Sequence, residues 1–426
     1  LSSLSAQPKG IPVQLAGPAS ISVADGTVNL QTLTLSVEDG SISVSGQAGK
    51  SLALRVDIAR LPLSLADKFS DGLDAAGTLD GTATINGAAS NPVIAFNANA
   101  TGLSTKQIAA NNLPPLDIRA DGRFADRRLT VDATSDIKGQ PLAVKTEVNL
   151  ADDQIAIPLI DVRLGRSSLA GALTLNAAFL PTGTVRFDLP DLALLAAMAG
   201  QKAEGALKGN AELATTGART EARIDATGLI RGKSVDIALQ AISDNGRISL
   251  PALKLDVGPN TLNGALTLDA GLLPSGKLSF DFPDIALLAA LAGQKAEGAL
   301  AGAADLRAMN GKLAGTLTAT GTRIIAGGAE ILKPSIDLKI ADITSGQISG
   351  SVSADRIASG ANSLSKLSLT LDHAASETAF NLKSQYDGAP LLAVGRLVQQ
   401  PDGLRIALDT FSAAPKTIPV KLNRPT

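Results

Sequence analysis

Most of this chain is built from short segments in which apolar and polar residues alternate strictly. From Ser51 to Ile58 every second residue is aliphatic, and the residues between them are small or charged. The segment 141–150 follows the same rule. Successive side chains of a β-strand point to opposite faces of the sheet, so a period of two predicts strands with one apolar and one hydrated face. The sequence therefore predicts a mostly β fold.

The clearest alternating segments supply the candidates for the apolar face. All are aliphatic residues at every second position of a predicted strand. The predicted members are Leu52, Leu54, Val56, Ile58, Leu142, Val144, Val148, Leu150, Ile336, Leu338, Ile340, Leu367, Leu369, Leu371, Leu404, Ile406 and Leu408.

Asp-Gly and Asn-Gly pairs indicate how the strands are joined. These pairs tolerate the positive φ angles of tight hairpin turns, and hairpins join antiparallel strands. A parallel β-helix would need crossover connections and a short fixed repeat, and the sequence shows neither. The chain is therefore predicted to be an antiparallel meander with turns at Asp25-Gly26, Asp39-Gly40, Asn86-Gly87, Asp121-Gly122, Asn245-Gly246, Asn310-Gly311, Asp387-Gly388 and Asp402-Gly403.

One stretch occurs twice. The sequence FDLPDLALLAAMAGQKAEGAL at 187–207 returns as FDFPDIALLAALAGQKAEGAL at 280–300, and a degenerate third copy lies within 61–81. Such internal repetition is typical of repeat architectures. We expect one elongated repeat rod over residues 1–426, with a duplicated unit at about 157–249 and 250–342. Because Leu1 is not a start methionine, we expect the rod to be a fragment of a longer protein.

Three short helices are predicted to mark the repeats, near 62–70, 190–199 and 283–292. Pro190 suits a first helical turn, and Asp191 complements the positive end of the helix dipole. Because about ten residues are too few for a stable isolated helix, we expect these segments to dock on the apolar side of the sheet. The predicted docking residues are Leu192, Leu195, Met198, Ile285, Leu288 and Leu291.

The composition bears on what the apolar face contacts. Aromatic residues are 2% of the chain while hydrophobic residues are 45%, so the apolar surface is almost wholly aliphatic, which suits aliphatic chains better than bases or sugar rings. Three short helices cannot cover the apolar face of roughly 25 strands. Two sheets could pack on each other, or one long sheet could curl into a trough that meets an apolar ligand.

Several functions find little support in the residues. A net charge of −2 is too balanced to indicate a nucleic-acid partner. His373 is the only histidine, so a catalytic triad or multi-histidine metal site would depend on it, and we interpret it as a solvated residue at a strand end. Asp152 and Asp153 are interpreted as a turn because they lack the alternating oxygen ligands of a calcium loop. No enzyme activity, cofactor or metal is predicted.

The motifs together resemble the TamB and AsmA-like family of Gram-negative envelope proteins. The matching features are G-x-L-x-G after a short Pro-initiated helix, at 205–209 and 298–302, and the related segments 169–175 and 262–268. This resemblance implies a repeating β-groove, or β-taco, in the periplasm, anchored by an inner-membrane helix that lies outside this sequence. It also implies transport of phospholipid toward the outer membrane, and assembly of outer-membrane β-barrels with a barrel partner of TamA type.

The main hypothesis is a non-enzymatic, bridge-like phospholipid conduit whose aliphatic groove receives acyl chains. One alternative is a scaffold, or translocation and assembly factor, whose open sheet edges template the strands of outer-membrane barrels. Another is a surface adhesin or fibrous passenger domain, whose sheet would close on itself. Lipid capture by the apolar face would separate the first hypothesis from the other two.

Overall fold

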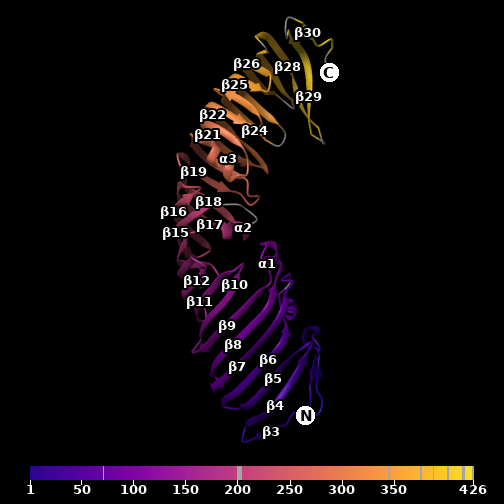
Figure 1. Cartoon of the computed structure of the whole chain (residues 1–426), viewed down its shortest axis with the longest axis vertical. Helices are drawn as coiled ribbons and strands as arrows, with labels where there is room; N and C mark the ends of the chain where they lie inside the picture. Colours follow the sequence, from indigo (N-terminus) through magenta and orange to yellow (C-terminus); the bar gives the residue numbers. More distant parts are fainter. Residues whose placement is uncertain are drawn as a thin grey trace. The chain divides into compact units, whose positions relative to one another are not determined.

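In the computed structural model the chain forms one long antiparallel β-sheet (Figure 1). The structure describes residues 1–70, 72–198, 204–343, 346–374, 377–386, 388–400, 403–414 and 418–424. Strands that follow each other in sequence are hydrogen-bonded neighbours over most of this length. The predicted mostly β, antiparallel fold is confirmed.

The chain divides into two compact units, Leu1–Thr215 and Thr216–Thr426. In the first unit the strands from β4 onward form a simple meander, and β1 to β3 are short. The strands of this unit are β1 Ser5–Ala6, β2 Val13–Leu15, β3 Ile21–Ala24, β4 Thr27–Val37, β5 Gly40–Ala48, β6 Ser51–Pro62, β7 Ala76–Ala88, β8 Asn91–Ser104, β9 Leu116–Ala125, β10 Arg128–Ile137, β11 Gln140–Leu150, β12 Gln154–Leu164, β13 Ser167–Asn176, β14 Pro181–Leu189 and β15 Gly205–Thr216.

The second unit continues the meander with one interruption. The short β23 lies between β22 and β24, which pair directly with each other. The strands are β16 Arg219–Ile230, β17 Lys233–Asp244, β18 Arg247–Val257, β19 Asn260–Leu268, β20 Pro274–Phe282, β21 Ala296–Met309, β22 Lys312–Ala326, β23 Ala329–Leu332, β24 Ser335–Asp342, β25 Gln347–Ser359, β26 Asn362–Ala374, β27 Glu377–Tyr386, β28 Ala389–Gln400, β29 Gly403–Ala413 and β30 Val420–Lys421.

The structure has more strands than expected because several of them are very short. About 25 strands were expected, and the described residues form 30. The five shortest, β1, β2, β3, β23 and β30, have two to four residues each. Such short pairings carry too few side chains to leave an alternation that can be recognised in the sequence.

The helices differ from the prediction at three points. Near 190–199 and 283–292 the structure has α2 (Ala193–Met198) and α3 (Ile285–Leu291). Near 62–70 it has a 3-10 helix, Leu63–Lys68, instead of an α-helix. A further helix, α1 (Lys106–Ala110), was missed; Thr105 caps it by accepting a hydrogen bond from Ile108 N. An additional 3-10 turn spans Pro8–Gly10.

The predicted hairpin turns are partly wrong. Asn245-Gly246 and Asn310-Gly311 form turns with positive φ angles, as expected. Asp121-Gly122 instead lies in the middle of β9, where its backbone pairs with both neighbouring strands. Asn86-Gly87 belongs to the end of β7. Tertiary strand pairing overrides the local turn preference at these two sites. The predicted turns that include Asp387 and Asp402 lie partly outside the described residues.

The element bounds repeat along the chain. A shift of 93 residues maps β12 onto β18 and β14 onto β20 without change at either end, and maps β13 onto β19 within one residue. The irregularity in strand pairing between Ile157 and Ile160 maps onto the one between Leu250 and Leu253. Over these three strands the sequence repeat therefore corresponds to a repeat of strand bounds and of the bulge.

The sheet has little enclosed core. Fourteen of the described apolar residues are fully buried, and half of these are alanine. The chain exposes 24359 Å² of surface, whereas a compact protein of this mass would expose about 15,000 Å² and two compact halves about 18,000 Å². Much of the apolar surface that the alternating strands create is therefore left partly accessible.

Candidate functional site

The candidate site is the apolar face of the sheet, which each unit builds from aligned rows of side chains. Residues that pair across antiparallel strands point to the same face. In the first unit, successive strand pairings place Leu54 on β6 and Val148 on β11 in one row. Each strand between them contributes an apolar residue to that row. The row runs Leu54, Ile85, Ile94, Phe124, Leu129 and Val148.

A second row in the same unit lies beside the first. It runs from Val56 to Ile160, and Thr146 is its one polar member. Its members are Val56, Ala83, Phe96, Gly122, Val131, Thr146 and Ile160. The pairing also places Val144 opposite Val162, and Leu142 opposite Leu164. The predicted members on β6 and β11 therefore share one face.

The second unit has equivalent rows. Ile336 and Leu369, two predicted members, are joined through Val352 on the strand between them. The row continues through Leu382, Ala393 and Phe411. A parallel row contains Leu338, Gly350, Leu371, Phe380, Gly395 and Leu408.

The predicted members of the apolar face are mostly half-buried. Those on β6, β24 and β26 are neither enclosed nor freely exposed. Leu150 and Ile406 are more open, with 40% and 61% of their surfaces exposed, because each lies near a strand end. The side chain of Leu404 lies outside the described residues. Half-buried aliphatic rows have surface available for an apolar ligand.

The sequence missed several members of these rows. Ile85, Ile94, Phe124 and Leu129 lie in the same row as Leu54. Ile85, Ile94 and Phe124 have asparagine or alanine as a direct neighbour, which weakens the contrast between the two faces. The period of two was nevertheless present in each strand and is the signal that could have found them.

The helix α3 is anchored at the end of the hairpin between β18 and β19. Asn260 is 1% exposed; its Nδ2 donates to Val257 O at 3.1 Å, and its Oδ1 accepts from Asp284 N at 3.0 Å. Asp284 in turn caps α3 by accepting from Leu287 N. Leu287 is the buried residue of this helix, although the predicted docking set omitted it.

The six predicted docking residues of the helices are all half-buried. Leu192, Leu195 and Met198 on or beside α2 have this burial, as do the three on α3. Gly258 lies close to the helix: a Cβ there would be 3.1 Å from Leu287 Cδ2. The repeated segment 200–203, which follows α2, lies outside the described residues.

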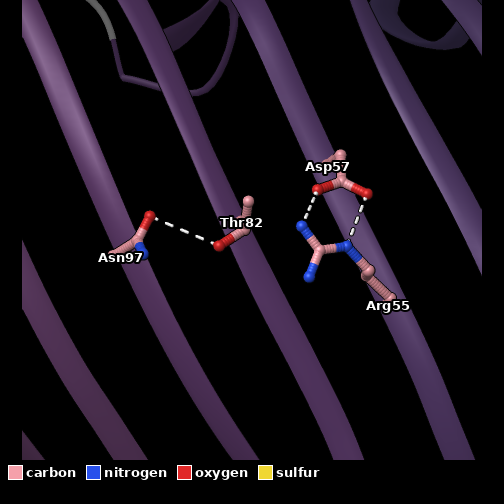
Figure 2. A network of polar contacts seen from close by, with 4 residues as sticks. All are labelled: Arg55, Asp57, Thr82 and Asn97. Carbon is pink, nitrogen blue, oxygen red and sulfur yellow. Dashed lines mark hydrogen bonds and ion pairs between the residues drawn. The ribbon is translucent and has the colours of Figure 1, made fainter.

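The opposite face is polar and its charges are paired locally. Figure 2 shows Arg55 and Asp57, two residues apart on β6, with Thr82 and Asn97 on the next two strands. Arg55 donates to Asp57 from Nε at 3.0 Å and from a terminal nitrogen at 2.7 Å. This hydrogen bond, and then the charge of Asp57, raise the pKa of Arg55.

The same arrangement recurs on other strands. Arg163 pairs with Asp161, Arg223 with Glu221, and Lys254 with Asp256, each two residues apart on one strand. The hydrogen bond to Asp256 is the main cause that raises the pKa of Lys254. Exposed pairs of this kind contribute little stability, but they mark a hydrated face.

Two ionisable side chains interrupt the apolar face of the second unit. Asp342 at the end of β24 has a side chain that is 2% exposed, and Lys312 Nζ lies 2.9 Å from its carboxylate. His373 Nδ1 lies 3.0 Å from Thr378 Oγ1, which donates to Gly346 O at 2.9 Å. His373 lies one residue before the end of β26 and is half-buried. The hydroxyl of Thr378 holds the imidazole against the neighbouring strand.

The other residues that could have carried chemistry have structural surroundings. Asp152 lies in the turn after β11 and forms an ion pair with Arg127 at 2.8 Å. Over the described ranges no group of three or more metal-binding side chains comes together, and no described helix has the length and hydropathy to cross a bilayer.

Among the shallow hollows of the described residues, four lie mainly along the polar face and the N-terminal strands. One of them, of about 830 Å³, includes Asn99, Asp117, Arg119, Thr134 and Asp136. No predicted member of the apolar face lines any of the four. The half-buried rows make the apolar face a candidate as an extended surface.

No protein-family model and no curated protein matches this chain, so the family resemblance stays a prediction.

Proposed function

We propose that the chain is a non-enzymatic conduit for phospholipid, in which acyl chains lie along the apolar face. The observation that carries this proposal is the row from Leu54 to Val148, which crosses six strands without a charged or polar member. The row from Ile336 to Phe411 supports it in the second unit. A hydrocarbon chain is the ligand that such a surface fits.

The energy of lipid binding follows from burial of methylene groups. Each acyl methylene that leaves water for an apolar surface is stabilised by about 0.8 kcal/mol. A uniform surface of Leu, Ile and Val has no single strongest position for such a chain. Lipid can therefore move along it with a low barrier while the headgroup stays in water.

A sheet that curls toward its apolar face would make this surface a groove. Gly183 on β14 and Gly276 on β20 have φ angles of 146° and 142°, and a Cβ on either would overlap a carbonyl oxygen of the preceding strand. Both belong to apolar rows. Close backbone approach at glycine is a common origin of sheet curvature, and it supports the proposed groove.

The length of each unit suits transport over a distance larger than one lipid. At ~4.8 Å per strand, β4 to β15 of the first unit cover about 53 Å along the sheet. We further propose that the full-length protein is anchored in the inner membrane, works in the periplasm and delivers phospholipid to the outer membrane. The motif resemblance is the support for this location.

Photo-crosslinking in cells tests the proposal. A photoreactive residue replaces Val144, on the apolar face, or Lys145, its neighbour on the opposite face. We expect phospholipid adducts at Val144 and none at Lys145. If neither position captures phospholipid, the proposed function is wrong. Capture of nascent outer-membrane barrels without phospholipid would favour the scaffold alternative.

A further inference from the structure

The phenylalanines of the apolar face have an arrangement that the sequence did not reveal. The chain has nine phenylalanines, and four of them pair with a glycine on the following strand. The pairs are Phe96 with Gly122, Phe187 with Gly209, Phe280 with Gly302 and Phe380 with Gly395. All four phenylalanines are half-buried and belong to apolar rows.

In three of the pairs the ring occupies the space above the glycine. A Cβ on Gly122 would overlap Phe96 Cζ, and a Cβ on Gly302 would lie 2.7 Å from Phe280 Cζ. The corresponding distance from Gly395 to Phe380 Cζ is 2.8 Å. The ring therefore covers backbone that a glycine would otherwise leave open on the apolar face. Without this cover the glycine would leave a gap in the apolar surface, where an acyl chain has no side chain to contact.

The pairs recur at a regular interval. Phe96 on β8 and Phe187 on β14 are six strands apart in the first unit. Phe280 on β20 and Phe380 on β27 are also six pairing steps apart in the second unit, because β22 pairs directly with β24. Six strands correspond to about 29 Å. Since the ~30 Å hydrocarbon core of a bilayer holds two layers of chains, one acyl chain contacts at most one such ring at a time.

We propose that the four phenylalanines are contact residues for the acyl chains. Each ring covers the glycine of the next strand and presents an apolar surface there. This inference rests on the proposed conduit function. It assigns the rings a role distinct from that of the aliphatic rows: the aliphatic rows supply the surface, and the rings keep it continuous where the strand has no side chain.

The pair of Phe96 and Gly122 offers the sharpest test, because the ring is the nearest neighbour of an added Cβ there. Gly122→Ala pushes the ring away from the sheet and into the path of the lipid. Phe96→Leu removes the ring and restores space for the alanine. The double variant is therefore the matched control for the single one.

Loading of the full chain with a pyrene-labelled phosphatidylglycerol from vesicles of phosphatidylglycerol and phosphatidylethanolamine measures the effect. We expect Gly122→Ala to slow loading by about tenfold, as overpacking of an apolar surface would. The double variant should return to within about twofold of the unchanged chain. Equal loading by Gly122→Ala and the unchanged chain would overturn the inference, as would a double variant as slow as the single one.

A photoreactive phenylalanine analogue at position 96 keeps the inference testable if Gly122→Ala does not fold. We expect phospholipid adducts at position 96 and none at position 95, which points to the polar face. Adducts at Leu54 without adducts at position 96 would overturn the role of the rings and leave the conduit function standing. Absence of adducts at both Leu54 and position 96 would overturn the conduit function itself.

Discussion

At the scale of single residues, the side of the sheet decides what a side chain can do. Leu54 and Ala53 are neighbours on β6, but Leu54 joins the apolar row while Ala53 is exposed on the other face. Each alternating strand therefore has adjacent residues that point to opposite faces of the sheet. A substitution on one face and the same substitution on the adjacent residue form a matched comparison.

Leu54→Arg should block lipid capture without unfolding the chain. A charge placed in hydrocarbon costs roughly 2.5–3.5 kcal/mol, which corresponds to about a 100-fold loss of lipid binding. The side chain is half-buried, so the arginine can reach water when no lipid is bound. Lipid loading and thermal unfolding measured together check this. Ala53→Arg is the control and should load normally; equal losses in both variants would contradict the assignment of faces.

Glu221 should give the stability of the second unit a small dependence on acid pH. Gln240 Nε2 donates to its carboxylate at 2.6 Å and Arg223 Nε at 3.1 Å. The hydrogen bond from Gln240, together with Arg223, lowers the pKa of Glu221 from its ordinary value of 4.5. A lowered folded-state pKa means that the stabilisation is complete above the unfolded-state value and is lost as the pH falls through the folded-state value.

We therefore expect Glu221→Gln to lower the unfolding temperature at pH 7 and to have no effect below the folded-state pKa. Thermal unfolding of both proteins across this pH range measures the difference. A difference that stays constant with pH would contradict the role of the ionised carboxylate.

At the scale of elements, the strands were predictable and their irregular connections were not. Alternation at 51–58 and 141–150 predicted β6 and β11 because one face of each is hydrated. Asp121-Gly122 failed as a turn because its glycine lies beneath the Phe96 ring, a contact between strands that local sequence does not encode. Similarly, Leu287 became the buried residue of α3 because Asn260 fixes how that helix begins. Such long-range contacts are invisible to periodicity.

Asn260→Ala should loosen α3. The substitution leaves Asp284 N without its acceptor in a nearly closed environment, which costs about 1–3 kcal/mol. Ser167→Ala, at the equivalent position of the first copy, is the control. Among the described hydrogen bonds, none joins the side chain of Ser167 to the start of α2. Hydrogen exchange of the α3 amides should rise in Asn260→Ala. Unchanged protection of α3 would show that Asn260 does not hold the helix.

At the scale of the whole molecule, strands β12 to β14 return with a shift of 93 residues as β18 to β20. The duplicated sequence predicted a repeated unit, and the structure shows which strands and which bulge recur in it. The proposed repeat rod requires that each copy contacts its neighbours in the same way. It should then be possible to remove one copy without loss of folding.

Removal of residues 161–253 joins Ile160 to Lys254 at equivalent positions of the two copies. We expect a folded, shorter chain that unfolds cooperatively, because the joined strand keeps its alternation. Removal of 161–252 is the control: it shifts the second half of that strand by one residue and turns its apolar side chains to the polar face. Circular dichroism during thermal unfolding distinguishes the two. Equal loss of folding in both deletions would contradict the repeat.

The central claim is that the apolar face carries phospholipid acyl chains. Mass spectrometry of the natively extracted, full-length protein tests it most directly, with the Leu54→Arg variant extracted in parallel. We expect several phospholipids bound to the unchanged protein and markedly fewer bound to the variant. Extraction of the unchanged protein without phospholipid, or with the same amount as the variant, would contradict it.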